Sequence, residues 1–182
     1  FQGDALTVTI SGLQGGHSGT EIHKGRANSN MLMGRLLQAM ASATDLRIVE
    51  VNGGLKDNAI PNKTSALVVV ADAAAAKAAA QEMGAHFASE YRVTDPKVVV
   101  TVEDASAGEA MDAASTKKVL CMLTCLPNGV QVMSADIEGL VQTSLNLGIL
   151  ATREHEVQAS FCVRSSVESQ KEMLKGRLSS LM

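Results

Sequence analysis

One histidine surrounded by glycines is the side chain in this sequence that is best placed to do chemistry. His17 follows Gly15 and Gly16 and precedes Gly19, directly after a strand-like segment. Because glycine allows tight or positive-φ turns, the imidazole is presented on a constrained loop. An imidazole held there can donate a hydrogen bond to a developing oxyanion or shuttle a proton. The same spacing is also compatible with an exposed turn histidine.

Three further polar residues lie in settings that suit substrate binding. Asn58 opens the stretch Asn-Ala-Ile-Pro, where its amide can hold a substrate group or only its own turn. Arg164 ends a strand-like segment, and its planar guanidinium can bind a carboxylate through two hydrogen bonds, form a surface ion pair or cap the following helix. Asn146 interrupts an apolar segment, which indicates a bulge, an edge or a contact point.

No complete catalytic motif accompanies these residues. The sequence has neither a Gly-x-Ser-x-Gly nucleophile elbow nor a phosphate-binding glycine loop with lysine. His17, Glu21 and His23 lie in a glycine-broken segment that lacks the helical register needed to align metal ligands. A solvated loop is the simpler interpretation of that segment, and we expect no metal site in this chain.

Three cysteines lie in apolar segments of the sequence. Cys121 and Cys125 share one face of a predicted helix, and Cys162 lies in a predicted strand. No nearby histidine or further cysteine completes a tetrahedral metal site around the helical pair. We therefore expect all three to be buried free thiols.

Composition narrows the classes of function. The chain has 182 residues, of which 46% are hydrophobic, and a net charge of −3. This is enough apolar material for a core, and no Lys/Arg cluster provides the basic surface of a nucleic-acid-binding protein. No apolar run approaches the roughly 20 residues that cross a bilayer. We expect a cytoplasmic protein that binds neither nucleic acid nor membrane.

Hydrophobic periodicity predicts the elements that must position these side chains. In residues 1–104 it predicts the order strand, helix, strand, strand, helix, strand, which is that of a ferredoxin-like two-layer α+β sandwich with helices on one face of an antiparallel sheet. Residues 113–182 are predicted to add a second α+β half. The chain is expected to form a single composite domain with a short seam at 104–112. The predicted strands are 6–11, 46–52, 65–71, 97–103, 130–134, 141–151 and 156–164, and the predicted helices are 30–43, 73–92, 113–126 and 169–181.

Taken in order along the chain, the motifs resemble those of the aminoacyl-histidine dipeptidases. These are carnosinase-like members of the aminoacylase and carboxypeptidase superfamily of zinc peptidases. The resemblance covers nearly the whole chain and departs from the family at Asn62-Lys63, where an Arg-Glu pair is expected. The stretches that carry it are residues 12–19, 25–30, 33–37, 53–54, 58–61, 144–148 and 163–166.

The resemblance implies that this chain is only the lid and dimerisation domain of a zinc-dependent dipeptidase. In that family the domain is inserted into a catalytic domain that binds two zinc ions, and the family's zinc-ligand motifs are absent here. The implied enzyme is a cytoplasmic homodimer that hydrolyses Xaa-His dipeptides such as β-alanyl-histidine. The chain alone is expected to bind no zinc and to be inactive.

The resemblance also implies roles for the candidate residues. His17 would reach into a metal centre, often that of the partner subunit, and stabilise the oxyanion of the tetrahedral intermediate. Asn58 and Arg164 would bind the substrate, and Arg164 would bind its carboxylate. By the same resemblance, Asn146 would be a third substrate-binding residue. The alternative is a non-catalytic ferredoxin-like module that dimerises or binds a small ligand.

Overall fold

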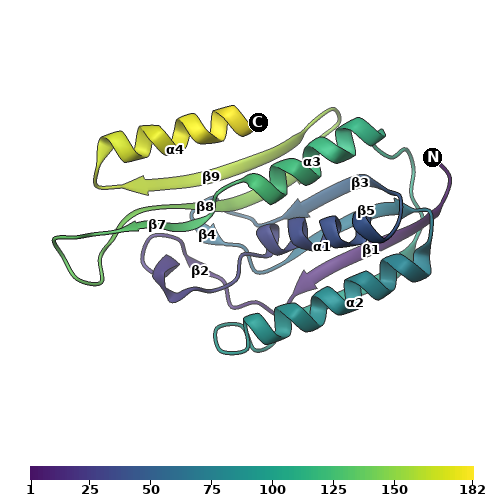
Figure 1. The fold of residues 1–182 in the computed structure, drawn as a ribbon, viewed down its shortest axis with the longest axis horizontal. Coiled ribbons are helices and arrows are strands. Elements are labelled where there is room, and N and C mark those ends of the chain that lie inside the picture. Colours follow the sequence, from purple (N-terminus) through teal and green to yellow (C-terminus); the bar gives the residue numbers. More distant parts are fainter.

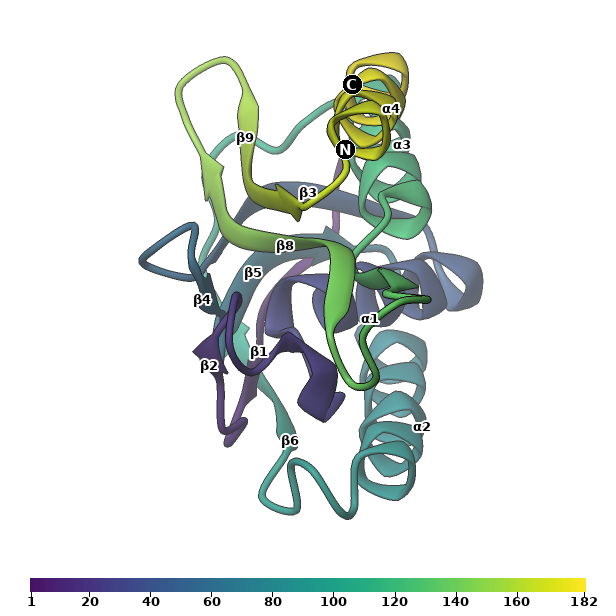
Figure 2. The ribbon, with the colours of Figure 1, turned by 90° about the vertical axis from the view of Figure 1, so that its left-hand side faces the viewer.

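An antiparallel sheet runs through the chain, and four α-helices pack on one of its faces (Figures 1 and 2). The computed structural model describes all residues, 1–182. No helix in it combines the length and the apolar character that a membrane crossing requires. The helices are α1 (Ser29–Ala43), α2 (Ala73–Glu90), α3 (Ala113–Cys125) and α4 (Glu168–Leu181), with a short 3-10 turn, η1 (Ile22–Lys24). The strands are β1 (Asp4–Ser11), β2 (Gly16–His17), β3 (Leu46–Gly53), β4 (Ala59–Ile60), β5 (Thr64–Val70), β6 (Val99–Ala105), β7 (Gly129–Met133), β8 (Val141–Thr152) and β9 (Val157–Ser165).

The first half has the predicted ferredoxin-like arrangement. Its four long strands lie in the order β6-β1-β5-β3, with antiparallel pairing throughout. The helices α1 and α2 connect β1 to β3 and β5 to β6, and both pack on the same face of the sheet (Figure 2). The α+β class and the two-layer architecture are therefore confirmed.

The second half extends this sheet and does not form a separate layer. Strand β8 pairs with β3 at Gly53 and Leu150, and β7 and β9 both pair with β8. An unpaired edge on β3 would expose backbone donors and acceptors. β8 pairs with this edge only at Gly53, and the backbone N–H groups of Ile48 and Val51 donate to the hydroxyls of Thr116 and Thr152. On the helical face α3 packs beside α1 (Figure 1).

Alternating burial along the strands explains the shared core. In β1 the side chains of Leu6, Val8 and Ile10 are fully buried toward the helices, while Thr7 and Thr9 face the other side of the sheet. The matching face of α1 is apolar at helical spacing, so strand and helix bury each other. Its buried hydrophobic residues are Leu32, Met33, Leu36, Leu37 and Met40.

Asparagine and aspartate side chains cap three of the four α-helices, α1, α2 and α3. The Asn28 side chain accepts hydrogen bonds from the backbone N–H groups of Asn30 and Met31 and so caps α1. Asp72 caps α2 in the same way, through the N–H of Ala75. Each cap satisfies donors that a helix cannot pair internally.

The cysteines depart from the expectation of buried thiols. Cys121 and Cys125 are exposed, and Cys162 is only partly buried. In α3 the inward face is provided by Leu120 and Leu123, which leaves the two cysteines on another side of the helix. An apolar segment predicted the helix correctly but did not show which of its side chains face the core.

Gly34 sets how closely α1 and α3 approach. A Cβ atom at this position would lie 2.7 Å from Leu123 Cβ and 2.9 Å from its carbonyl oxygen. We predict that Gly34→Ala lowers the free energy of unfolding by about 1–3 kcal/mol, because the helices must separate. Urea denaturation measures the change.

The matched control is Gly176→Ala in α4, where an added Cβ meets nothing within 4 Å. Alanine is the better helix former, so this variant should be as stable as wild type or more stable by up to about 1 kcal/mol. Equal stability of Gly34→Ala and wild type would contradict the close helix contact.

Candidate functional site

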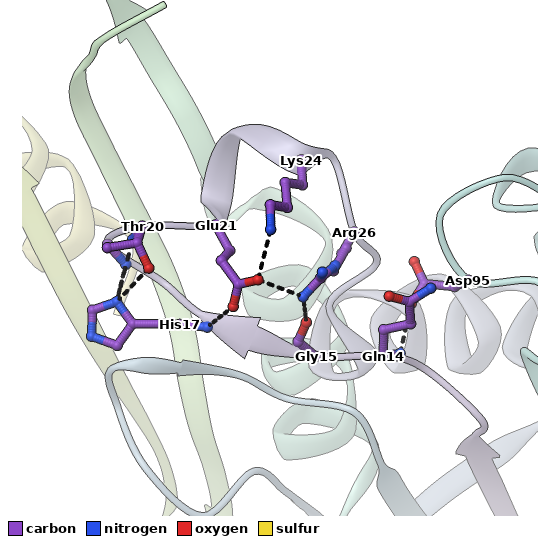
Figure 3. A network of polar contacts seen from close by, with 9 residues as sticks. Gln14, Gly15, His17, Thr20, Glu21, Lys24, Arg26 and Asp95 are labelled. Carbon is purple, nitrogen blue, oxygen red and sulfur yellow. Dashed lines mark hydrogen bonds and ion pairs between the residues drawn. The ribbon is translucent and has the colours of Figure 1, made fainter.

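The loop that carries His17 is closed at its base by a buried carboxylate. Asp95 is fully buried, and its two carboxylate oxygens accept hydrogen bonds from the backbone N–H groups of Gln14, at 2.8 Å, and Ala27, at 2.9 Å. These donors lie at the two ends of the loop, so one side chain fixes both; Figure 3 shows Asp95 beside Gln14. A buried carboxylate bonded to two amides costs much less than an unpaired one.

A second acidic side chain organises the loop from within. Glu21 Oε2 accepts from the backbone N–H of His17 at 2.9 Å, and Glu21 Oε1 lies 2.9 Å from Lys24 Nζ and 3.2 Å from Arg26 Nη1 (Figure 3). The hydrogen bond from Lys24, that from the His17 backbone and the nearby Arg26 charge lower the pKa of Glu21 from 4.5 to about 2. Arg26 also donates to the carbonyl oxygen of Gly15.

The His17 ring is held by one nitrogen and open at the other. Its Nδ1 accepts from the backbone N–H groups of Gly19, at 3.1 Å, and Thr20, at 3.2 Å. Because Nδ1 accepts, a neutral ring carries its proton on Nε2. The side chain is exposed and Nε2 has no partner within the chain, so a hydrogen-bond donor of fixed direction faces outward.

A two-stranded ladder joins the His17 loop to the Asn58 loop. In the β2–β4 pair, Gly16 lies opposite Ile60 and His17 opposite Ala59. The backbone N–H of Ser18 donates to the carbonyl oxygen of Asn58 at 2.9 Å. Two loops that are about 40 residues apart in the sequence therefore form one rigid unit.

Arg164 comes to the same place from the second half of the chain. A Cβ atom added at Gly19 would lie 2.9 Å from His17 Cε1 and 3.2 Å from both Cζ and Nε of Arg164. The imidazole and the guanidinium therefore flank one glycine. Arg164 is exposed and forms no ion pair with any carboxylate of the chain, although a surface ion pair was an alternative.

Asn146 lies beneath the site and is buried. Its side-chain amide donates to the carbonyl oxygens of Asp57, at 2.9 Å, and Ala59, at 2.8 Å, on either side of Asn58. Its Oδ1 accepts from Asn28 Nδ2 at 3.2 Å. Both amide hydrogens are therefore used to hold the Asn58 loop on β8.

A buried polar contact that we call the asparagine junction is formed by Asn28, Asn30, Asn128 and Asn146. Asn28 and Asn30 both donate to the carbonyl oxygen of Leu147, at 3.1 and 3.2 Å, and Asn128 Oδ1 accepts from the Leu147 N–H at 2.8 Å. The junction links the start of α1 to β8, which comes from the other half of the chain. It fixes the distance between the halves at the level of the site.

The arrangement brings together three of the four predicted site residues at the surface and places the fourth beneath them. Neighbouring segments carry His17, Asn58 and Arg164. The groups that face solvent include the Nε2–H donor of His17 and the positively charged guanidinium of Arg164. Such a pair suits a substrate that carries a carboxylate and develops a second negative charge. Sequence reasoning missed the supporting residue Asp95, since a single buried acid after a helix has no distinctive pattern.

The residues present do not form a zinc site. No group of three or more histidine, cysteine, aspartate or glutamate side chains is placed to hold a metal ion. The Glu21 carboxylate contacts the His17 backbone N–H and not the imidazole, and it is already paired with two cations.

Known proteins resemble the chain over almost its whole length. Residues 8–95 match the family described as peptidase dimerisation domain. The cytosol non-specific dipeptidase of Escherichia coli (strain K12) is 32% identical over 181 residues, which cover 98% of this chain and 37% of that protein. The crystal structure of aminoacylhistidine dipeptidase from Vibrio alginolyticus matches with a TM-score of 0.94 at 32% identity, again over 98% of this chain and 37% of that one. The chain spans little more than a third of either relative.

Removal of the Asp95 charge should loosen the His17 loop. In Asp95→Asn the amide nitrogen cannot accept one of the two backbone N–H bonds, so a buried donor is left unpaired. We predict a loss of about 1–3 kcal/mol in the free energy of unfolding and faster amide hydrogen exchange at residues 14–27. Asp104→Asn is the control, because Asp104 is exposed and pairs only with Lys77. Unchanged exchange in Asp95→Asn would contradict the anchoring role.

Glu21 should contribute to stability in a pH-dependent way. Its folded-state pKa lies below the ordinary value of 4.5, so the ionised form favours the folded state. The contribution is therefore complete above pH 4.5 and is lost as the pH falls toward 2. We predict that the difference in unfolding free energy between wild type and Glu21→Gln shrinks over this interval. A difference that is constant between pH 6 and pH 2, measured by urea denaturation, would show that the Glu21 charge is not involved.

Proposed function

We propose that this chain, whose residues 8–95 match the peptidase dimerisation domain family, is the lid and dimerisation domain of a dipeptidase. In this proposal the peptide bond is cleaved in a catalytic domain elsewhere in the same polypeptide. The present chain provides side chains that bind the substrate and stabilise the transition state. The observation that carries the proposal is the convergence of His17 and Arg164 on Gly19, with neither group paired to a protein carboxylate.

His17 acts as the oxyanion donor in this proposal. Addition of water to a peptide carbonyl places a negative charge on its oxygen, and a donor that is already oriented stabilises that charge without reorganisation. The Nδ1 contacts of His17 leave Nε2–H as the available donor and fix its direction. Its loop is held by Asp95 and Glu21, so the ring needs little movement to serve this role.

Arg164 binds the carboxylate at the C-terminal end of the dipeptide. A guanidinium can hold a carboxylate through two parallel hydrogen bonds, which sets both position and orientation. Asn58 lies on the adjoining loop, where its half-buried amide can bind a polar group of the substrate. The buried Asn146 positions the Asn58 loop and has no free amide hydrogen for the substrate.

Two zinc ions belong to the catalytic domain in this proposal. When bound, such ions activate the attacking water and polarise the carbonyl. The residues of this chain add charge stabilisation and substrate orientation and do not ligate the ions.

The substrates we propose are Xaa-His dipeptides such as β-alanyl-histidine, hydrolysed in the cytoplasm by a homodimer. The name aminoacylhistidine dipeptidase of one relative supports the substrate, and the name cytosol non-specific dipeptidase of the other supports the location. The family's name supports the dimer. Within this chain, β6 pairs only with β1 and so offers an unpaired sheet edge to a second copy.

A non-catalytic module that only dimerises or binds a small ligand is the alternative. It requires no relation between His17, Asn58 and Arg164, which come from three separate segments. Their proximity favours the dipeptidase.

Replacement of His17 tests the proposal in the full-length enzyme. We predict that His17→Ala lowers kcat by about 10²–10³ and leaves KM nearly unchanged, because the donor acts on charge that exists only in the transition state. Arg164→Ala should instead raise KM mainly. His23→Ala, an exposed histidine of the same loop, is the control and should retain activity. Wild-type turnover by His17→Ala would rule out the oxyanion role.

Gly19 offers a second test that leaves both functional side chains in place. Alanine is allowed by the Gly19 backbone, which lacks a positive φ, but its Cβ would displace the His17 ring and the Arg164 guanidinium. We predict that Gly19→Ala loses about 10²-fold in kcat/KM, since small misplacements of positioned groups have such effects. Its thermal stability should stay close to wild type. Gly108→Ala, where an added Cβ meets nothing, should be fully active, and equal activity of both variants would refute the shared contact.

A further inference from the structure

Two thiols lie side by side on the outer surface of α3, away from the site described above. Cys121 and Cys125 are one helical turn apart, both are exposed, and their sulfur atoms are 4.0 Å apart. The helix lies on the opposite face of the sheet from β2 and β4, which carry the candidate site (Figure 2). The pair therefore has no part in the proposed dipeptidase chemistry.

The helix opposes a disulfide between these cysteines. A disulfide needs an S–S bond of about 2.05 Å and Cβ atoms about 3.5–4.5 Å apart. Positions i and i+4 of an α-helix hold their Cβ atoms about 5–6 Å apart. The sulfurs can approach to 4.0 Å within the helix, but bonding would distort it.

A metal ion bound by both sulfur atoms fits the same sulfur–sulfur distance without distorting the helix. Metal–thiolate bonds of about 2.3 Å allow two sulfurs bound to one ion to lie up to about 4.6 Å apart. The observed 4.0 Å lies inside that limit. We propose that Cys121 and Cys125 form a binding site for a soft monovalent cation of the Cu(I) type.

The ligand set selects for this class of ion. No third histidine, cysteine, aspartate or glutamate joins the pair, so zinc, which takes four ligands in structural sites, would be poorly held. Thiolates favour soft ions, and Cu(I) is the first-row ion that suits them at a low coordination number. Lys117 and Lys118 lie one turn before Cys121 and offset the negative charge of a bis-thiolate.

Binding is coupled to proton release. One Cu(I) ion and two thiols give a bis-thiolate complex and two protons, with no change of oxidation state. Affinity should therefore rise with pH.

Competition with the chromogenic chelator bicinchoninate, under anaerobic conditions, tests the site in the full chain. Wild type is expected to withdraw one equivalent of Cu(I) from the chelator. Cys121→Ser and Cys125→Ser should each weaken the affinity by more than about 100-fold, since each removes a ligand. Cys162→Ser is the matched control and should bind like wild type, because Cys162 lies in β9 and not beside the pair.

Two outcomes would overturn the inference. One is a wild-type affinity no greater than that of the Cys121→Ser/Cys125→Ser double variant. The other is loss of binding in Cys162→Ser with retention in Cys121→Ser. Circular dichroism of each variant confirms folding, which exposed Cys→Ser changes should preserve. Phenylarsine oxide, which condenses with two thiols and releases water, provides a second readout and should protect two of the three cysteines from a thiol reagent.

Discussion

A buried amide must satisfy its hydrogen-bonding groups inside the protein, and the asparagine junction is where this constraint fixes the structure. Asn146 can satisfy its amide only if the Asn58 loop, the start of α1 and β8 all meet at one point. The same point joins the two halves of the chain. Apolar packing alone would tolerate small shifts between them, whereas this set of directional bonds does not.

The placement of the surface site follows from buried parts. The asparagine junction holds the Asn58 loop in place. The β2–β4 ladder joins this loop to the His17 loop, and Asp95 holds the two ends of the His17 loop together. Nε2 of His17, the Arg164 guanidinium and the half-buried Asn58 amide remain open to a ligand. Rigid support beneath a few exposed polar groups is the arrangement that electrostatic stabilisation of a transition state requires.

Local patterns predicted the elements well, because the periods of strand and helix are imposed by burial against a single face. They also placed His17, Asn58 and Arg164 in polar loops or at a strand end. Contacts between distant segments were beyond local patterns: the β2–β4 ladder, the Asp95 clamp and the merging of the second half into the first sheet. The exposed Cys121 and Cys125 show a further limit, since composition does not tell which side of an amphipathic helix is covered.

The central claim is that this domain directs His17 Nε2–H and Arg164 at one bound dipeptide. A crystal structure of the full-length enzyme with a phosphinic analogue of an Xaa-His dipeptide tests it most directly, because the tetrahedral phosphorus mimics the charged intermediate. The account predicts His17 Nε2 about 2.7–3.1 Å from a phosphinyl oxygen and Arg164 on the analogue's carboxylate. An analogue bound with His17 turned to solvent and Arg164 paired to a protein carboxylate would contradict it.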